Sequence, residues 1–243
     1  MKKLLSSAIA AILTISAATT VAQPNRAKAM LVKSNSSSVV AKFTTPLPRT
    51  ISVETPRGAA NLYLIDGAAN ILSKGMPALP KLTKSIISPS NTKVKLVITD
   101  STYKDIPNVM VAPSKGNISR DQDPAKIPFT YGTVYDKNQF FPGNLAEVGN
   151  SYTLRKYNGV PIIVYPLQYN PVTKVLRVYT SITVEARFEA NSSIAAMVSQ
   201  STTTTTTNDG FRDIYKSQFL NYSETTSDRY TPLSDEGTML IVC

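Results

Sequence analysis

The sequence SYTLRKYNGVPIIVYPLQYNPVTKVLRVYTSITVEARF, residues 151–188, holds three short runs of β-branched and aromatic residues separated by two turn signals. The first signal is Asn158-Gly159, a pair that tolerates the positive φ of a tight hairpin turn. The second is Asn170-Pro171, which turns the chain before the last run. The stretch therefore predicts a three-stranded antiparallel meander.

Three runs upstream of this stretch alternate between apolar and polar residues, as half-buried strands do: residues 51–55, 61–65 and 93–98. Breaks that contain proline or glycine separate them, no long helical pattern precedes residue 210, and strands do not alternate with helices. We therefore expect an all-β fold in which residues 41–198 form one antiparallel β-sandwich, with aligned or jelly-roll-like packing.

The segments that flank this sandwich differ from it in composition. Residues 23–40 are rich in Ser, Ala and Lys and are expected to form a flexible N-terminal segment. Residues 199–210 contain a run of threonines and are expected to form a flexible linker. A short amphipathic helix is predicted over residues 211–222, capped by Asn208 or Asp209. Apolar residues recur there at helical spacing, namely Phe211, Ile214, Tyr215, Phe219 and Leu220. This stripe favours docking on the core, and a partner-binding face is the alternative.

The composition of the 243 residues removes much of the usual catalytic chemistry. The chain has no His and no Trp, and its single Cys is the last residue, Cys243. It therefore has no partners for an intramolecular disulfide, a Cys/His zinc site or a Cys–His dyad. Ser–Lys and paired-carboxylate chemistry remain open on composition, but no spacing indicates them. We expect this chain not to be an enzyme by itself.

No cofactor is expected either. Asp121 and Asp123 begin like a calcium loop, but Lys126 stands where that loop needs Gly and Gly132 stands where it needs Glu. The chain also lacks a Gly-rich phosphate-binding loop. We therefore predict no metal site.

Residues 1–22 are typical of a secretory signal peptide. A short basic start precedes an apolar stretch, and small residues lead to a predicted cleavage between Ala22 and Gln23. The apolar stretch is shorter than the ~20 residues that span a bilayer. We therefore expect a secreted chain without stable membrane insertion.

The positive charge is concentrated in the first third of the mature chain. Residues 23–98 hold 11 basic and two acidic residues, whereas residues 99–243 hold 13 basic and 14 acidic residues. Such a field steers a chain toward an acidic protein surface or anionic lipid, or serves as a solvated basic face. Because clustered arginines and stacking aromatics are missing, nucleic acid is not an expected partner.

The last residues, GTMLIVC at 237–243, form an apolar run typical of a buried central strand, which needs neighbours on both sides. Either this run completes the sandwich, or residues 230–243 are the truncated start of a further domain. The second interpretation is favoured.

Seven irregular motifs occur in an order that resembles the N-terminal prodomain of gingipain-type cysteine endopeptidases, above all the Arg-specific gingipains. They are KGMPALP (74–80), APSKGNISR (112–120), IPFTYG (127–132), FFPG (140–143), LQYNPVTKVLR (167–177), DIYK (213–216) and RYTP (229–232). The resemblance covers residues 74–242, and residues 33–73 match only in their general residue pattern. It implies a β-rich prodomain that assists folding of a following catalytic domain and inhibits it, exported through the periplasm to the cell surface.

The resemblance also implies an inhibitory loop, whose residues here are Asn117, Ile118, Ser119, Arg120 and Asp121. In the family an arginine enters the specificity pocket of the protease, so Arg120 would act as a pseudo-substrate. A planar guanidinium can meet a pocket carboxylate with two parallel hydrogen bonds. The alternative is an exposed ion pair of Arg120 with Asp121 or Asp123, worth ~0.2–1 kcal/mol.

The resemblance further places the maturation cleavage between Arg229 and Tyr230. Residues 211–229 then form the helix and tail of the prodomain, and residues 230–243 begin the catalytic domain. Cys243 is not the catalytic cysteine of the family, which lies far downstream. The alternative is that Arg229 is only a charged linker residue.

Three functions therefore remain open from the sequence. The first is an inhibitory prodomain, whose partner is a gingipain-like catalytic domain in cis or in trans. The second is an orphan surface β-sandwich that binds or adheres through its basic first third. The third is a fragment of an active cysteine endopeptidase precursor.

Overall fold

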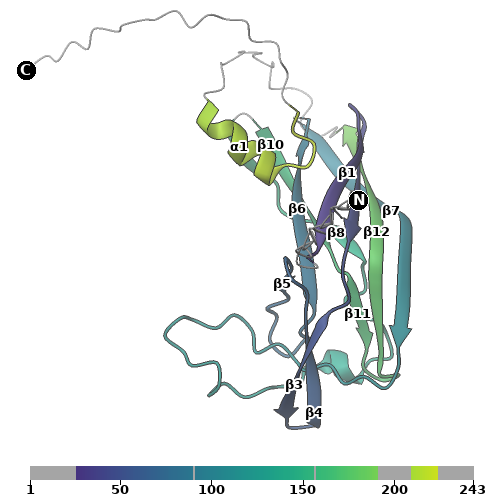
Figure 1. Cartoon of the computed structure of the whole chain (residues 1–243), viewed down its shortest axis with the longest axis vertical. Coiled ribbons are helices and arrows are strands. Elements are labelled where there is room, and N and C mark those ends of the chain that lie inside the picture. The colour runs from purple at the N-terminus through teal and green to yellow at the C-terminus, as the bar shows by residue number, and fades with distance from the viewer. Residues whose placement is uncertain (1–25, 90, 156, 191–208, 224–243) are drawn as a thin grey trace, which may run out of the picture.

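A computed structural model describes residues 26–89, 91–155, 157–190 and 209–223 (Figure 1). The predicted signal peptide with Ala22 and Gln23, most of the Thr-rich linker, the predicted cleavage residues Arg229 and Tyr230, and the C-terminal apolar run lie outside the described residues.

Two antiparallel sheets form the body of the described chain (Figure 1). The first sheet contains β1 (Lys28–Ser34), β2 (Ser38–Thr44), β7 (Thr92–Ile106), β11 (Leu167–Asn170) and β12 (Val175–Ala190). The second contains β5 (Ala69–Asn70), β6 (Pro80–Ser88), β8 (Ala146–Val148), β9 (Tyr152–Leu154) and β10 (Tyr157–Val164). A hairpin of β3 (Arg49–Thr55) and β4 (Gly58–Leu64) extends one end, next to the short 3-10 helix η1 (Thr133–Asp136). The expected all-β antiparallel sandwich is confirmed.

The core lies between the two sheets because their strands alternate buried and outward-facing side chains. Phe43 of β2 and Val184 of β12 from the first sheet share one buried cluster with Ile86 of β6 and Ile162 of β10 from the second. A second cluster fills the end of the sandwich near the β3–β4 hairpin, where Tyr169 is fully buried. Full burial of one such side chain contributes about 1.5–3 kcal/mol to folding.

The predicted hairpin turn at Asn158-Gly159 is wrong. Both residues lie inside β10, and β9 pairs with β10 so that Leu154 faces Tyr157. The reversal instead begins at Arg155, which has a φ of 53°. Gly159 is needed for a different reason: a Cβ there would lie 2.5 Å from Cζ of Tyr152.

The predicted three-stranded meander is also wrong, because β10 and β11 belong to different sheets. The chain crosses between the sheets at Tyr165 and Pro166. The Tyr165 N–H donates to the Leu145 carbonyl at 2.9 Å, whereas the Pro166 carbonyl accepts from the Tyr179 N–H at 2.8 Å. The turn at Asn170-Pro171, which joins β11 to β12, is confirmed.

The predicted flexible segment at residues 23–40 contains strand structure, so the sandwich begins earlier than residue 41. β1 and β2 pair antiparallel within it, and β2 pairs in turn with β12. Asn35 makes the turn between them, since its Oδ1 accepts from the Ser37 and Ser38 N–H groups at 2.9 and 2.7 Å. Neither strand was predicted, because the alternation of buried residues in β2 is short and β1 is an exposed edge strand.

Helix α1 (Asp209–Gln218) ends four residues before the predicted limit of 222. It stops because the following residues pair with β6. The Leu220 N–H donates to the Ser85 carbonyl at 2.9 Å, and the Asn221 amide both accepts from Ile87 N–H at 2.7 Å and donates to its carbonyl at 2.9 Å. Tyr215 of α1 is buried, so docking of the helix on the core is confirmed.

We predict that Gly159→Ala loosens the docked helix. Its Cβ would lie 2.5 Å from Tyr152 Cζ and 2.9 Å from Phe219 Cε1, and both rings must then move. Overpacking of this kind costs about 1–3 kcal/mol of unfolding free energy, which urea titration measures. Gly143→Ala is the matched control, because a Cβ at Gly143 meets nothing within 4 Å. Equal stability of the two variants would contradict this packing.

A partly exposed ion pair between Arg177 of β12 and Asp105 of β7 joins these two strands. The Arg177 guanidinium donates two hydrogen bonds to Asp105, at 2.8 and 2.9 Å. It also lies over the Tyr103 ring at 4.2 Å and the Phe140 ring at 4.4 Å. The Arg177 hydrogen bonds hold the pKa of the Asp105 carboxyl below its ordinary value.

We predict that the effect of Asp105→Asn on stability depends on pH. A carboxyl whose pKa is lowered by folding stabilises the fold above its unfolded pKa, and this stabilisation disappears as pH falls through the folded pKa. Because the Asp105 side chain is 40% exposed, the loss near neutral pH is expected to be only about 1 kcal/mol. Urea unfolding at about pH 7 and about pH 2 measures it, and a difference that persists in acid would contradict the assignment.

Candidate functional site

The loop between Ser114 and Gly132 carries all five residues of the predicted inhibitory loop and projects from the β3–β4 end of the sandwich as the teal loop of Figure 1. Both ends of this loop are bonded to one residue, Gly75. The Gly75 N–H donates to the Ser114 carbonyl at 2.9 Å, and the Gly75 carbonyl accepts from the Gly132 N–H at 2.9 Å. We call this arrangement the Gly75 crossing.

Glycine is required on both sides of the crossing. Gly75 has a φ of 80°, in the left-handed region, and a Cβ there would lie 3.1 Å from the Gly132 nitrogen. A Cβ on Gly132 would lie 2.9 Å from the Gly75 oxygen. Because backbone atoms cannot yield as flexible side chains do, any larger residue must push the two ends of the loop apart.

The chain that leads into the loop is fixed to the sandwich. The Ala112 N–H donates to the Asn61 carbonyl of β4 at 2.9 Å, and the Ala112 carbonyl accepts from the Ala78 N–H at 3.0 Å. One step further, the Ser114 N–H donates to the Met76 carbonyl at 2.7 Å. The loop therefore starts from a rigid base.

The chain that leaves the loop is fixed by a buried tyrosine. The Tyr135 hydroxyl, in η1, donates to the Val111 carbonyl at 2.9 Å. Burial raises the pKa of the Tyr135 phenol, and the neighbouring phenols of Tyr131 and Tyr169 raise it further. Tyr135 therefore remains a neutral hydrogen-bond donor at physiological pH.

The tip of the loop presents Arg120 to solvent. Asn117, Ser119, Arg120 and Asp121 are exposed, and Ile118 is half-buried. The Ser119 carbonyl accepts from the Gln122 N–H at 3.1 Å, which places Arg120 and Asp121 at the corner of a turn. The structure thus brings the five predicted residues together at one exposed tip.

The alternative interpretation of Arg120 as half of a loop ion pair is not what the structure contains. Within the described ranges, the ion pairs join other residues, and none links Arg120 to Asp121 or Asp123. The Asp123 carboxylate instead accepts from the Ala125 N–H at 2.9 Å. The Arg120 guanidinium is therefore accessible to a partner molecule.

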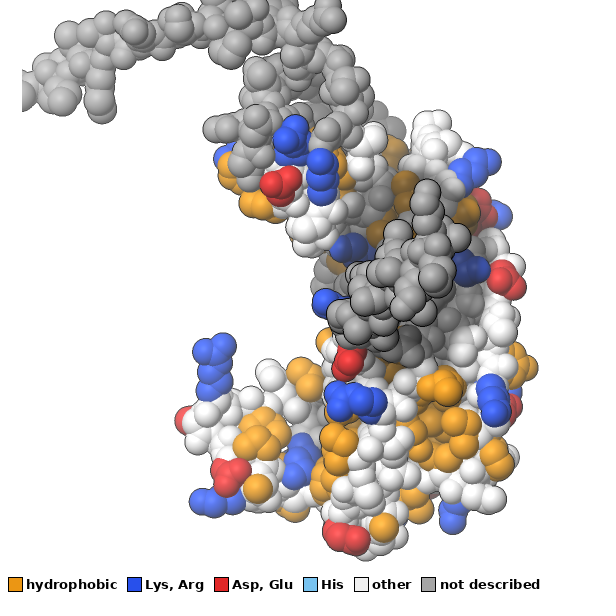
Figure 2. Space-filling model, viewed as in Figure 1, with side chains coloured by type: hydrophobic (Ala, Val, Ile, Leu, Met, Phe, Trp, Pro, Cys, Tyr) orange, Lys and Arg blue, Asp and Glu red, His pale blue; other side chains and the backbone are white. Residues whose placement is uncertain are grey.

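The inner side of the loop covers an apolar hollow of about 420 Å³. Ile118 and Phe129 of the loop line it from one side, and Leu62 of β4, Ile71 and Leu72 line it from the other. Figure 2 shows this end of the molecule as a separate lobe with hydrophobic, basic and acidic side chains close together.

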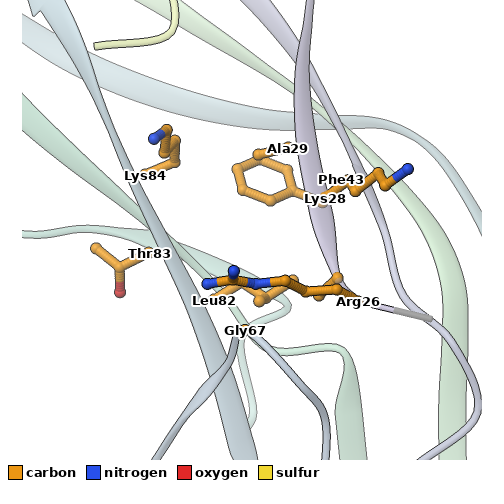
Figure 3. A pocket seen from close by; sticks show the side chains of 9 residues that line it. Arg26, Lys28, Ala29, Phe43, Gly67, Leu82, Thr83 and Lys84 are labelled. Atoms are coloured by element: carbon orange, nitrogen blue, oxygen red, sulfur yellow. The ribbon is translucent and has the colours of Figure 1, made fainter. Parts of the chain in front are cut away.

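A second hollow, of about 330 Å³, lies between β1, β2 and β6 (Figure 3). Arg26, Lys28 and Lys84 surround it, with Phe43 at its wall. The Lys84 ammonium donates to the Ser217 carbonyl at the end of α1 at 2.5 Å, so this lysine already supports the helix.

Three cations of the basic first third are paired with acidic residues. The pairs are Arg49 with Asp66 at 3.3 Å, Arg57 with Asp136 at 3.5 Å and Lys95 with Glu189 at 3.9 Å. Within the described ranges, no group of His, Cys, Asp and Glu is arranged to hold a metal ion. In the same part of the chain, no helix has the length and apolar character needed to cross a bilayer.

The fold and the loop together define the class of protein. It is an all-β domain with one projecting loop that is held at both ends and exposes its side chains to solvent. The Propeptide_C25 family model matches residues 18–229. The chain therefore belongs to the Propeptide_C25 family, the propeptides of gingipain-type cysteine protease precursors.

Curated relatives agree with this family. Gingipain R1 of Porphyromonas gingivalis is 38% identical over 192 residues, which are 78% of this chain and 19% of that protein. Gingipain R2 of the same species is 39% identical over 194 residues, which are 78% of this chain and 25% of that protein. The chain thus spans a quarter or less of the length of these relatives.

Solved structures agree as well. A complex of Porphyromonas gingivalis RgpB pro- and mature domains contains a chain with a TM-score of 0.70 and 36% identity, matching 82% of this chain and 99% of that one. A structure on zymogenic latency of gingipain K matches with a TM-score of 0.57 and 23% identity, over 70% of this chain and 96% of that one, and shows the fold alone. The resemblance to the prodomain of Arg-specific gingipains is confirmed.

The structure also identifies site residues that sequence reasoning missed. Gly75 and Gly132 fix the base of the loop, and Lys115 bridges its neck. Each of these three residues lies in a motif that carries the resemblance, so the sequence did contain a signal for them. The motifs are KGMPALP, APSKGNISR and IPFTYG, and they meet at the Gly75 crossing. Their proximity in space was not visible in the sequence.

We predict that Gly75→Ala destabilises the chain more than Gly58→Ala does. Both glycines have positive φ, 80° and 95°, so both variants bear backbone strain, of about 1–2 kcal/mol. Only at Gly75 does the new Cβ meet backbone atoms, whereas nothing lies within 4 Å at Gly58. Urea unfolding of both variants isolates the cost of the close approach. Equal losses would show that the crossing tolerates a methyl group.

Proposed function

We propose that this chain is the inhibitory and folding-assisting prodomain of a gingipain-like cysteine endopeptidase, with Arg120 occupying the specificity pocket of the protease. The observation that carries the proposal is the position of Arg120. It lies exposed at the corner of a turn, on a loop whose two ends are bonded to Gly75. The family match and the similarity to the RgpB prodomain support the same function.

The chemistry of an arginine-specific pocket explains the choice of residue. Such a pocket must hold a carboxylate, and a guanidinium can bind it through two parallel hydrogen bonds. Truncation of one partner in a buried pair of this kind costs several kcal/mol, much of it because the other charge is left unpaired. A loop that is already ordered also loses less conformational entropy when it binds. Arg120 is then a tethered pseudo-substrate.

The remaining parts of the proposal concern processing and location. Cleavage between Arg229 and Tyr230 separates the prodomain from the catalytic domain, and the end of the family match at residue 229 supports a boundary there. Residues 1–22 direct export, with cleavage between Ala22 and Gln23, and the precursor passes through the periplasm to the cell surface. Inhibition then keeps the enzyme inactive during export.

We predict that the purified chain inhibits an Arg-specific gingipain in trans and that Arg120→Ala weakens the inhibition at least about tenfold, equivalent to about 1.4 kcal/mol. Arg120→Lys is expected to lose affinity as well, because an ammonium cannot reproduce the two parallel hydrogen bonds. Inhibition constants from a chromogenic arginyl substrate measure both effects.

Arg49→Ala is the matched control, since Arg49 is an exposed arginine on β3 outside the loop. An unchanged inhibition constant for Arg120→Ala would remove the pseudo-substrate role and leave inhibition, if present, to the surface of the sandwich. Absence of any inhibition by the unmodified chain would favour the surface-binding module instead.

A further inference from the structure

Lys115 connects three separate parts of the loop. Its backbone directly follows Ser114, at the start of the loop. Its ammonium donates to the Pro124 carbonyl on the opposite limb at 2.7 Å. The same ammonium lies 4.3 Å from the centre of the Phe129 ring, near the end of the loop. One half-buried cation therefore bridges the neck of the loop.

The acceptor on the opposite limb, the Pro124 carbonyl, is held in place by hydrogen bonds that do not involve Lys115. The Asp123 carbonyl accepts from the Lys126 N–H at 3.1 Å, and the Asp123 carboxylate accepts from the Ala125 N–H at 2.9 Å. Pro124 lies between these bonds, and its ring fixes φ. The Pro124 carbonyl is thus a positioned acceptor for a charged donor.

The backbone around Lys115 also favours this bridge. Gly116 has a φ of 90°, in the left-handed region, and its N–H donates to the Ser114 hydroxyl at 3.2 Å, so the backbone is held on both sides of Lys115. A Cβ on Gly116 would lie 3.2 Å from Lys74 Cβ. From this position the Lys115 side chain reaches across the loop to the Pro124 carbonyl.

The contact between Lys115 and Pro124 closes a smaller loop within the larger one. Ile118 and Phe129 on the inner side line the apolar hollow above β4. The part from residue 116 to residue 123, with Arg120 near its middle, is closed by the contact between Lys115 and Pro124. Without the ammonium, this part no longer has a bond from Lys115 to the opposite limb, although it keeps the Ser119 turn, the hydrogen bond from Gly116 to Ser114 and the position of Ile118 at the hollow.

We propose that Lys115 is a positioning residue for inhibition: its ammonium closes the neck of the loop and holds Arg120 in the orientation that enters the protease pocket. This inference rests on the proposed function, because Lys115 acts on the protease only through Arg120. In this role Lys115 restrains the loop from within and does not itself contact the enzyme.

A double-mutant cycle tests the inference. We expect Lys115→Met, which keeps the length of the side chain and removes its charge, to weaken inhibition by about threefold to tenfold. In the Arg120→Ala background the same change is expected to have no further effect, because the residue that it positions is absent. Lys115→Arg, which keeps a charged donor, is expected to restore inhibition to within about twofold of the unmodified chain.

Lys126→Met is the matched control, since Lys126 is an exposed lysine on the same loop and its loss changes the net charge equally. A loss equal to that of Lys115→Met would show that the charge of the loop, and not the bridge, matters. An equal loss for Lys115→Met with and without Arg120 would overturn the positioning role, as would no loss in either background.

Amide hydrogen exchange of residues 116–123 separates the two proposals. Faster exchange in Lys115→Met than in Lys126→Met is expected if the ammonium restrains the outer loop, and unchanged exchange overturns the bridge whatever the protease assay shows. If Arg120→Ala leaves inhibition unchanged while exchange rises in Lys115→Met, the pseudo-substrate function fails and the positioning role fails with it. If Arg120→Ala abolishes inhibition and Lys115→Met does not affect it, only the positioning role fails.

Discussion

The Gly75 crossing is the constraint on which the presentation of the loop depends. Two hydrogen bonds of 2.9 Å, one from each end of the loop, meet on a single residue with positive φ. This geometry converts a long surface loop into a closed projection whose ends cannot separate without breaking a backbone contact. The sandwich supplies the second half of the constraint, because Ala112 is bonded to β4 and Tyr135 is bonded to the Val111 carbonyl. The base of the loop is therefore part of the core, while its tip remains in solvent.

Local sequence patterns predicted those parts of the fold whose causes are local. The alternating runs at 51–55, 61–65 and 93–98 became β3, β4 and β7. Of the apolar stripe after residue 210, Tyr215 is buried in α1, whereas Ile214 is exposed and the buried Phe219 follows the helix. Asn158-Gly159 misled because its glycine makes room for two rings, Tyr152 on the neighbouring strand and Phe219 of the chain after α1, and the contact with Phe219 is nonlocal. No window around residue 159 contains that information.

The sequence located one part of the candidate loop, its tip, because the residues of the tip are local to each other. The family motifs located the tip of the loop, since Arg120 and its neighbours are contiguous in sequence. The Gly75 crossing joins residues from two distant segments, and the bridge from Lys115 depends on the carbonyl of Pro124. A carbonyl acceptor has no sequence signature because every residue carries one. Such positioning contacts become visible only when the backbone is known.

The candidate loop and helix α1 lie at opposite ends of the sandwich (Figure 1). The Gly75 crossing and its loop lie at one end, whereas α1, after which the chain leads toward residue 229, docks on β6 at the other (Figure 1). None of the contacts described for the base of the loop involves α1. Cleavage after Arg229 would therefore leave the loop, its bridge and Arg120 as ordered as before. If the proposed function holds, cutting the chain would turn a tethered inhibitor into a free one and would lower only the effective concentration of the loop at the protease pocket. Under the same proposal, release of activity would require dissociation or destruction of the sandwich itself.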